Sequence, residues 1–154
     1  MKGLDDIDKK ILSLLQVDAR MSNKALALEV GLSASPTFER VKRLEKQGYI
    51  KSYKAVCDPK KLGLDLLAFC QVSLRDHSEE FILRFQKAVK DIDVIVSCYH
   101  VAGNYDYLLQ IRIENMEAYQ DFIVKTLARI PNVATVHSSF VMAEIKDQSP
   151  LAID

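Results

Sequence analysis

The type of hydrophobic repeat changes once along this chain, and the change limits the folds that the chain can adopt. Up to about residue 47 the apolar residues recur every three to four positions, which is typical of helices. From residue 66 onward, alternating strand-type segments are interleaved with helical ones in the order strand, helix, strand, strand, helix, strand. This order predicts a ferredoxin-like βαββαβ module. The expected fold class is therefore α+β, with a helical N-terminal module before the βαββαβ module.

The first two helices are short and have recognisable ends. The first is expected over residues 5–16, with Asp5 as its cap and an apolar stripe at helical spacing. The second begins at Ser22 or Asn23 and ends at Gly31.

The third helix follows the second after a tight turn that contains glycine. It is expected to run to about Gln47, with Ser33 as its cap and Pro36 in its first turn. Ser35 as the cap, with Pro36 at the first helical position, is the alternative. Two helices joined in this way form a helix-turn-helix.

The exposed face of the third helix combines serine, phenylalanine and several cations. Its opposite face, with Thr37, Val41 and Leu44, should turn toward the other helices. Serine and cationic side chains reach base edges and phosphates, which favours a recognition helix. A solvated basic face without a ligand is the alternative. The residues expected to contact DNA are Ser33, Ser35, Thr37, Phe38, Glu39, Arg40, Lys42, Arg43, Lys46 and Lys51.

Residues 49–56 alternate apolar and polar side chains, a pattern that predicts a strand. A strand directly after the recognition helix makes the module a winged helix-turn-helix.

The net charge of zero conceals two halves of opposite sign. Residues 1–61 hold 13 Lys and Arg against 8 Asp and Glu, a net of +5, and residues 62–154 carry −5. Pro59 and Gly63 flank the join, as expected for a connector. We therefore expect two domains with different partners, 1–61, which contains the helix-turn-helix, and 62–154.

The second module should place both helices on one face of its sheet. The other face also carries apolar residues, which favours a homodimer through the sheet. The glycine-containing sequence at residues 102–104 predicts a hairpin turn. The expected strands are residues 66–74, 94–101, 105–113 and 132–142, and the expected helices are residues 78–89 and 115–129.

Three segments in this order resemble the Lrp/AsnC family of prokaryotic transcription regulators. Residues 4–20 are similar to its opening helix, and residues 31–50 contain Glu-Arg-Val-Lys-Arg-Leu-Glu-Lys-Gln-Gly-Tyr-Ile, its recognition-helix pattern. Residues 103–109, Gly-Asn-Tyr-Asp-Tyr-Leu-Leu, match the motif of its effector module. The resemblance implies a regulator that binds double-stranded DNA at a pseudo-palindromic operator and forms dimers, commonly tetramers or octamers.

The resemblance also implies an amino-acid effector bound between dimers. Gly103 and Asn104 could expose N–H groups to a carboxylate, and Asp106 could bind an ammonium group. A plain hairpin turn is the alternative for this segment. The apolar members of the implied set suit an apolar or sulfur-containing side chain. The implied effector residues are Val101, Gly103, Asn104, Tyr105, Asp106, Met116, Thr126, Ser139, Phe140 and Val141.

The remaining chemical signals are weak. The three histidines and three cysteines lack metal-ligand spacing, so we expect no metal and no cofactor. The sparse cysteines and the absence of a long apolar run favour a cytoplasmic protein that does not enter a membrane. The resemblance implies that it is nucleoid-associated. Siroheme decarboxylases resemble the same scaffold, but their haem pocket needs cations and histidines in the second module, which here is acidic. A regulator, not an enzyme, is therefore expected. A sensor whose helix-turn-helix meets only proteins is a further alternative.

Overall fold

Two separate hydrophobic cores divide the protein into two units. The structure, a computed structural model, describes residues 3–147 and 149–153. The chain passes from the first unit to the second after Val56 and returns to the first after Glu144. The expected boundary after residue 61 is corrected accordingly, because residues from Ile145 onward belong with the N-terminal unit. Ile153 packs against the core of that unit, which explains the return.

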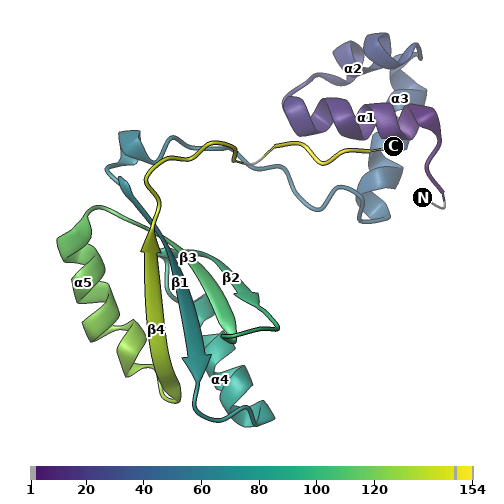
Figure 1. The fold of residues 1–154 in the computed structure, drawn as a ribbon. Helices are drawn as coiled ribbons and strands as arrows, with labels where there is room; N and C mark the ends of the chain where they lie inside the picture. The colour runs from purple at the N-terminus through teal and green to yellow at the C-terminus, as the bar shows by residue number, and fades with distance from the viewer. Residues whose placement is uncertain (1–2, 148, 154) are drawn as a thin grey trace. The chain divides into compact units, whose positions relative to one another are not determined.

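The N-terminal unit is a bundle of three helices, α1 (Asp6–Val17), α2 (Asn23–Val30) and α3 (Ala34–Lys46) (Figure 1). Each helix contributes buried aliphatic side chains to one core. Their burial removes apolar surface from water, which is the main force that holds such a small unit together. The most buried members are Ile11, Leu12, Leu26 and Leu44.

The helix ends follow the expected capping chemistry. Asp5 and Asp8 form a reciprocal capping box at the start of α1, and the Ser22 side chain accepts from the Ala25 N–H at the start of α2. Gly31 ends α2 with a φ of 70°, a left-handed conformation that glycine adopts without strain. Ser33 occupies the cap position of α3, as predicted, but its side chain makes no capping hydrogen bond.

The strand expected at residues 49–56 is not formed, which corrects that prediction. In the described part of the chain these residues have no strand assignment. A strand needs a neighbour to share its N–H and C=O groups, and an alternating pattern alone does not supply one.

The second unit is a four-stranded antiparallel sheet with two helices. The strand order is β2-β3-β1-β4, as expected of a βαββαβ module. The elements are β1 (Leu66–Leu74), α4 (Glu79–Lys90), β2 (Ile95–His100), β3 (Tyr107–Ile113), α5 (Met116–Lys125) and β4 (Val133–Phe140). The helix expected over 115–129 is shorter, because α5 ends at Lys125 and a separate 3₁₀ turn follows at Leu127–Arg129.

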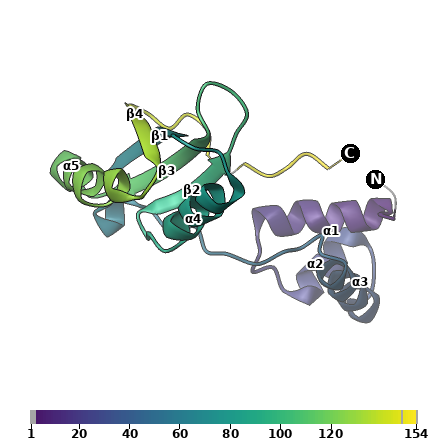
Figure 2. The same ribbon diagram turned by 90° about the horizontal axis from the view of Figure 1, so that it is seen from below.

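Helices α4 and α5 cover one face of this sheet (Figures 1 and 2). Alternate residues of β1 and β3 are buried beneath them, as their sequence pattern predicted, including Cys70, Leu109 and Ile111. On the opposite face Phe69, Leu108 and Tyr99 are only partly buried or exposed. In the described residues, no helix is long and apolar enough to cross a membrane.

Candidate DNA-contact surface and effector site

The exposed face of α3 carries most of the residues expected to meet DNA. Phe38 is 47% exposed, and the Lys42 ammonium lies 5.6 Å from the centre of its ring. A shallow cleft of about 260 Å³ lies beside Phe38, between the starts of α2 and α3, and Ser35 and Glu39 help to line it. The exposed members of the expected set are Ser33, Ser35, Phe38, Glu39, Lys42, Arg43, Lys46 and Lys51.

Thr37 does not belong to this surface, which corrects the expectation that it contacts DNA. Its side chain is fully buried, and its hydroxyl donates to the Ser33 carbonyl oxygen at 2.9 Å. It lies on the face of α3 that packs on the bundle, so its polar group is satisfied inside the unit.

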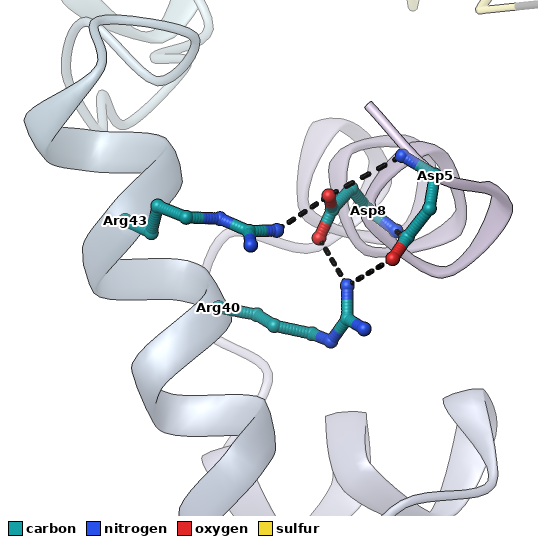
Figure 3. Close-up of polar contacts among 4 residues, drawn as sticks. All are labelled: Asp5, Asp8, Arg40 and Arg43. Atoms are coloured by element: carbon teal, nitrogen blue, oxygen red, sulfur yellow. Dashed lines mark hydrogen bonds and ion pairs between the residues drawn. The ribbon is translucent and has the colours of Figure 1, made fainter. Parts of the chain in front are cut away.

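Two arginines of α3 bind a buried carboxylate instead of facing solvent freely (Figure 3). Asp8 of α1 is 1% exposed, and its two carboxylate oxygens accept from Arg40 at 2.7 Å and from Arg43 at 2.5 Å. Arg40 also donates to Asp5 at 2.6 Å. The Asp8 N–H, followed by the Arg40 guanidinium, lowers the pKa of Asp5 below its usual value. This cluster therefore fixes the recognition helix to α1.

The cluster changes which cations are available to DNA. Each charge-assisted hydrogen bond to Asp8 neutralises part of the charge on Arg40 and Arg43. Lys46 and Lys51 remain the more accessible cations, and Lys42 keeps 59% of its side chain exposed although its ammonium lies 3.4 Å from Glu45. One feature of the sequence could have indicated this cluster. Asp8 lies on the apolar stripe of α1, where a buried carboxylate needs a cationic partner.

The first group of expected effector residues lies in the turn between β2 and β3, Val101–Asp106. Gly103 has a φ of 151°, which side chains rarely tolerate, and the turn is closed by the Val101 N–H donating to the Asp106 carbonyl oxygen. In the described part of the chain, the N–H groups of Gly103 and Asn104 donate to no acceptor. They are therefore available to an anionic group.

Asp106 already has a structural task. Its Oδ2 accepts from the Leu74 N–H at 2.7 Å, and its Oδ1 lies 2.9 Å from His77 Nε2. Partial burial acts to raise the pKa of Asp106, but the Leu74 N–H and the His77 ring together lower it below the usual value. A carboxylate has about four lone-pair positions, so Asp106 can accept a further donor.

The second group lies where β4 ends and α5 begins. It consists of Met116, Ser139, Phe140 and Val141, with Met116 and Phe140 each 42% exposed. The Phe140 ring packs edge-on against Tyr119, with centroids 5.0 Å apart. This group therefore offers apolar surface with one adjacent hydroxyl.

One chain does not bring the two groups together. Asp106 is bonded to Leu74, whereas Phe140 pairs with Ala68, six residues away along β1. At ~3.3 Å per residue the two levels are roughly 20 Å apart, too far for one amino acid to span. Thr126, the remaining member, lies at the C-terminal end of α5 and is exposed. Within the described residues, no cluster of His, Cys, Asp or Glu could hold a metal ion.

Comparisons with known proteins agree along almost the whole chain. Residues 4–51 match the family described as "Winged helix-turn-helix DNA-binding", and residues 67–151 match the "Lrp/AsnC ligand binding domain". The leucine-responsive regulatory protein of Escherichia coli K12 is 41% identical over 152 residues, which cover 99% of this chain and 93% of the relative.

Solved structures show the same architecture. A transcriptional regulator of Neisseria meningitidis in complex with L-Met is 37% identical, with a TM-score of 0.93 over 97% of this chain and 96% of that one. An AsnC family transcriptional regulator of Agrobacterium tumefaciens is 33% identical, with a TM-score of 0.91 over 97% of each chain. These are names of regulators and not of enzymes, which removes support for the decarboxylase alternative. The chain belongs to the Lrp/AsnC family of transcription regulators, with a winged helix-turn-helix for DNA and a ligand-binding domain.

Proposed function

We propose that this regulator responds to an amino acid with an apolar or sulfur-containing side chain, bound between subunits. The observation that carries the proposal is the separation of the two residue groups by roughly 20 Å along β1. A complete site then needs the turn Val101–Asp106 of one chain and the Phe140 region of another. The similar Neisseria meningitidis regulator in complex with L-Met supports an effector of this class.

The two groups match the two parts of an amino acid. The N–H groups of Gly103 and Asn104 suit its carboxylate, and the free lone pairs of Asp106 suit its ammonium. Met116 and Phe140 offer apolar contacts to its side chain. Ser139 and Thr126 supply hydroxyls at the edge of the set.

The DNA-binding part of the proposal concerns symmetry. A homodimer through the uncovered face of the sheet presents two α3 helices, and such a dimer fits a pseudo-palindromic site in double-stranded DNA. The uncovered face of the sheet, on which Phe69 is only partly buried, gives the second copy its contact. Further assembly to tetramers or octamers places the turn Val101–Asp106 of one chain beside the Phe140 region of another, as an effector site shared between chains requires. Binding to many sites would make the protein nucleoid-associated.

A thermal-shift screen of the proteinogenic amino acids tests whether an effector exists. A ligand that binds only the folded state raises the melting temperature, by an amount that grows with its concentration. We expect L-Met or another apolar amino acid to raise it. An Asp93→Asn control should retain the shift and Asp106→Asn should lose it, while no shift with any amino acid would contradict the proposal.

Mixed assemblies test whether the site is shared between chains. Asp106→Asn disables the first group and Phe140→Ala the second, so each variant alone should bind no effector. Co-expressed at equal levels, the two variants should regain about a quarter of the wild-type sites, because each site draws its two halves independently. Calorimetric titration counts these sites. No recovery in the mixture would show that both groups act within one chain.

A further inference from the structure

The last described residues of the chain return to the N-terminal unit and line a groove of it. The groove has a volume of about 450 Å³ and runs between α1 and the segment that follows α3. Leu12 and Leu15 of α1 line it together with Ile50, and residues 151–153 of the same chain form a further wall. The C-terminal segment therefore packs beside α1 and borders this groove.

The contact of this C-terminal segment has polar and apolar parts. The Gln16 side-chain amide donates to the Leu151 carbonyl oxygen at 3.1 Å, and its Oε1 accepts from the Leu151 N–H at 2.7 Å. One side chain thus satisfies both backbone groups of one residue, as a neighbouring strand would. Two residues on, Ile153 packs against the core formed by Ile11, Leu12, Leu26 and Leu44.

We propose that residues 149–153 form a C-terminal clasp, a segment that binds the groove of its own helix-turn-helix unit through Gln16 and Ile153. Each contact is weak by itself. Because the segment is tethered to the same chain, however, it meets the groove at a high effective concentration and needs little affinity to stay bound. Through the clasp, the segment that follows β4 forms a second connection to the DNA-binding unit, in addition to the linker after Val56.

Cross-linking in the full-length chain tests the clasp. Cys57→Ser and Cys98→Ser remove the two exposed thiols, and Cys70 is buried. Ala19 lines the groove and the Leu151 side chain is 78% exposed, so Ala19→Cys with Leu151→Cys places a reactive pair beside the contact without touching Gln16. A short bis-maleimide should link this pair within one chain much faster than the control pair Leu28→Cys with Leu151→Cys.

A third substitution connects the cross-link to the proposed contact. Gln16→Ala in the Ala19→Cys, Leu151→Cys background should slow the link by about tenfold, because two hydrogen bonds of typical net strength are lost. Ser13→Ala, on the same helix but outside the groove, should leave the rate unchanged. Equal rates for the groove and control pairs, or no effect of Gln16→Ala, would overturn the clasp. A product of dimer size instead of monomer size would also overturn it, since another copy's tail would then fill the groove.

Discussion

Asp8 is the residue whose chemistry matters most to the DNA-binding unit. It is 1% exposed, and it holds Arg40 and Arg43 from a helix that begins more than twenty residues later in the sequence. A buried charge is tolerated only when it is paired and hydrogen-bonded, as it is here. The carboxylate therefore sets how the recognition helix packs on α1, although it never touches DNA itself.

Replacing Asp8 by asparagine should destabilise the N-terminal unit by about 3 kcal/mol, because Arg43 loses its anionic partner and Arg40 keeps only Asp5. Asp6→Asn is the matched control, since Asp6 is fully exposed and only weakly paired with Lys9 at 3.7 Å. Urea denaturation followed by circular dichroism measures both. Equal stability of the two variants would show that the cluster contributes nothing to the fold.

Asp106 should make the second unit sensitive to acid. Its pKa is lower in the folded protein than in the unfolded chain, so the carboxylate stabilises the fold at pH values above its unfolded pKa of about 4. That contribution is lost as the pH falls below 4 and the folded group takes up its proton. The melting temperature of the wild type should therefore approach that of Asp106→Asn between pH 6 and pH 3, and a constant difference would contradict this assignment.

At the scale of elements, local sequence predicted most of the fold. The cap positions Asp5 and Ser33, and the alternation along β1 and β3, depend on neighbours a few residues away, and these predictions are confirmed. The prediction of a strand at residues 49–56 was wrong, because a strand needs a neighbouring strand for its hydrogen bonds and an alternating sequence pattern cannot supply one.

The parts of the site that depend on long-range register could not be read from the sequence. The sequence analysis assigned the expected effector residues, from Val101 to Val141, to one site. The pairing of Ala68 with Phe140 instead places the Phe140 group far along β1 from the turn that contains Asp106. The contact of Asp8 with Arg40 and Arg43 likewise joins two helices whose packing angle no local pattern encodes.

Neighbouring cations of the recognition helix α3 should have different roles, so that one substitution affects DNA binding and the other affects the stability of the unit. Lys42→Ala should weaken binding to a duplex obtained by binding-site selection and reduce the salt slope by about 1, without changing the melting temperature. Arg43→Ala should instead lower the stability of the unit by about 1–2 kcal/mol, because Arg43 is a partner of Asp8. Gel shifts at several salt concentrations and thermal melts distinguish the two effects. A destabilised Lys42→Ala would refute this separation.

At the scale of the whole molecule, two cores imply two unfolding events. Among the residues that the structure describes, the core of the helix-turn-helix unit and that of the sheet unit have no buried residue in common, so each should melt as its own cooperative body. Calorimetry should show two transitions, of which Asp8→Asn lowers only one and an amino-acid effector raises the other. A single transition that responds to both changes would show that the units unfold together.

The two units of the structure also carry opposite charges, because residues 1–56 and 145–154 hold 12 Lys and Arg against 9 Asp and Glu, a net of +3, and residues 57–144 carry −3. The acidic half should be repelled by the duplex, so that only the basic half approaches phosphate.

The chain crosses between its units twice, after Val56 and after Glu144. A unit that is connected by two segments of polypeptide has less rotational freedom than a unit that is connected by one. Major-groove faces recur along a duplex every ~10 base pairs, so a restrained pair of recognition helices reads helical phasing as well as base sequence. We therefore expect such a regulator to reject operators whose halves have been rotated apart by half a turn, even when every base that it contacts is unchanged.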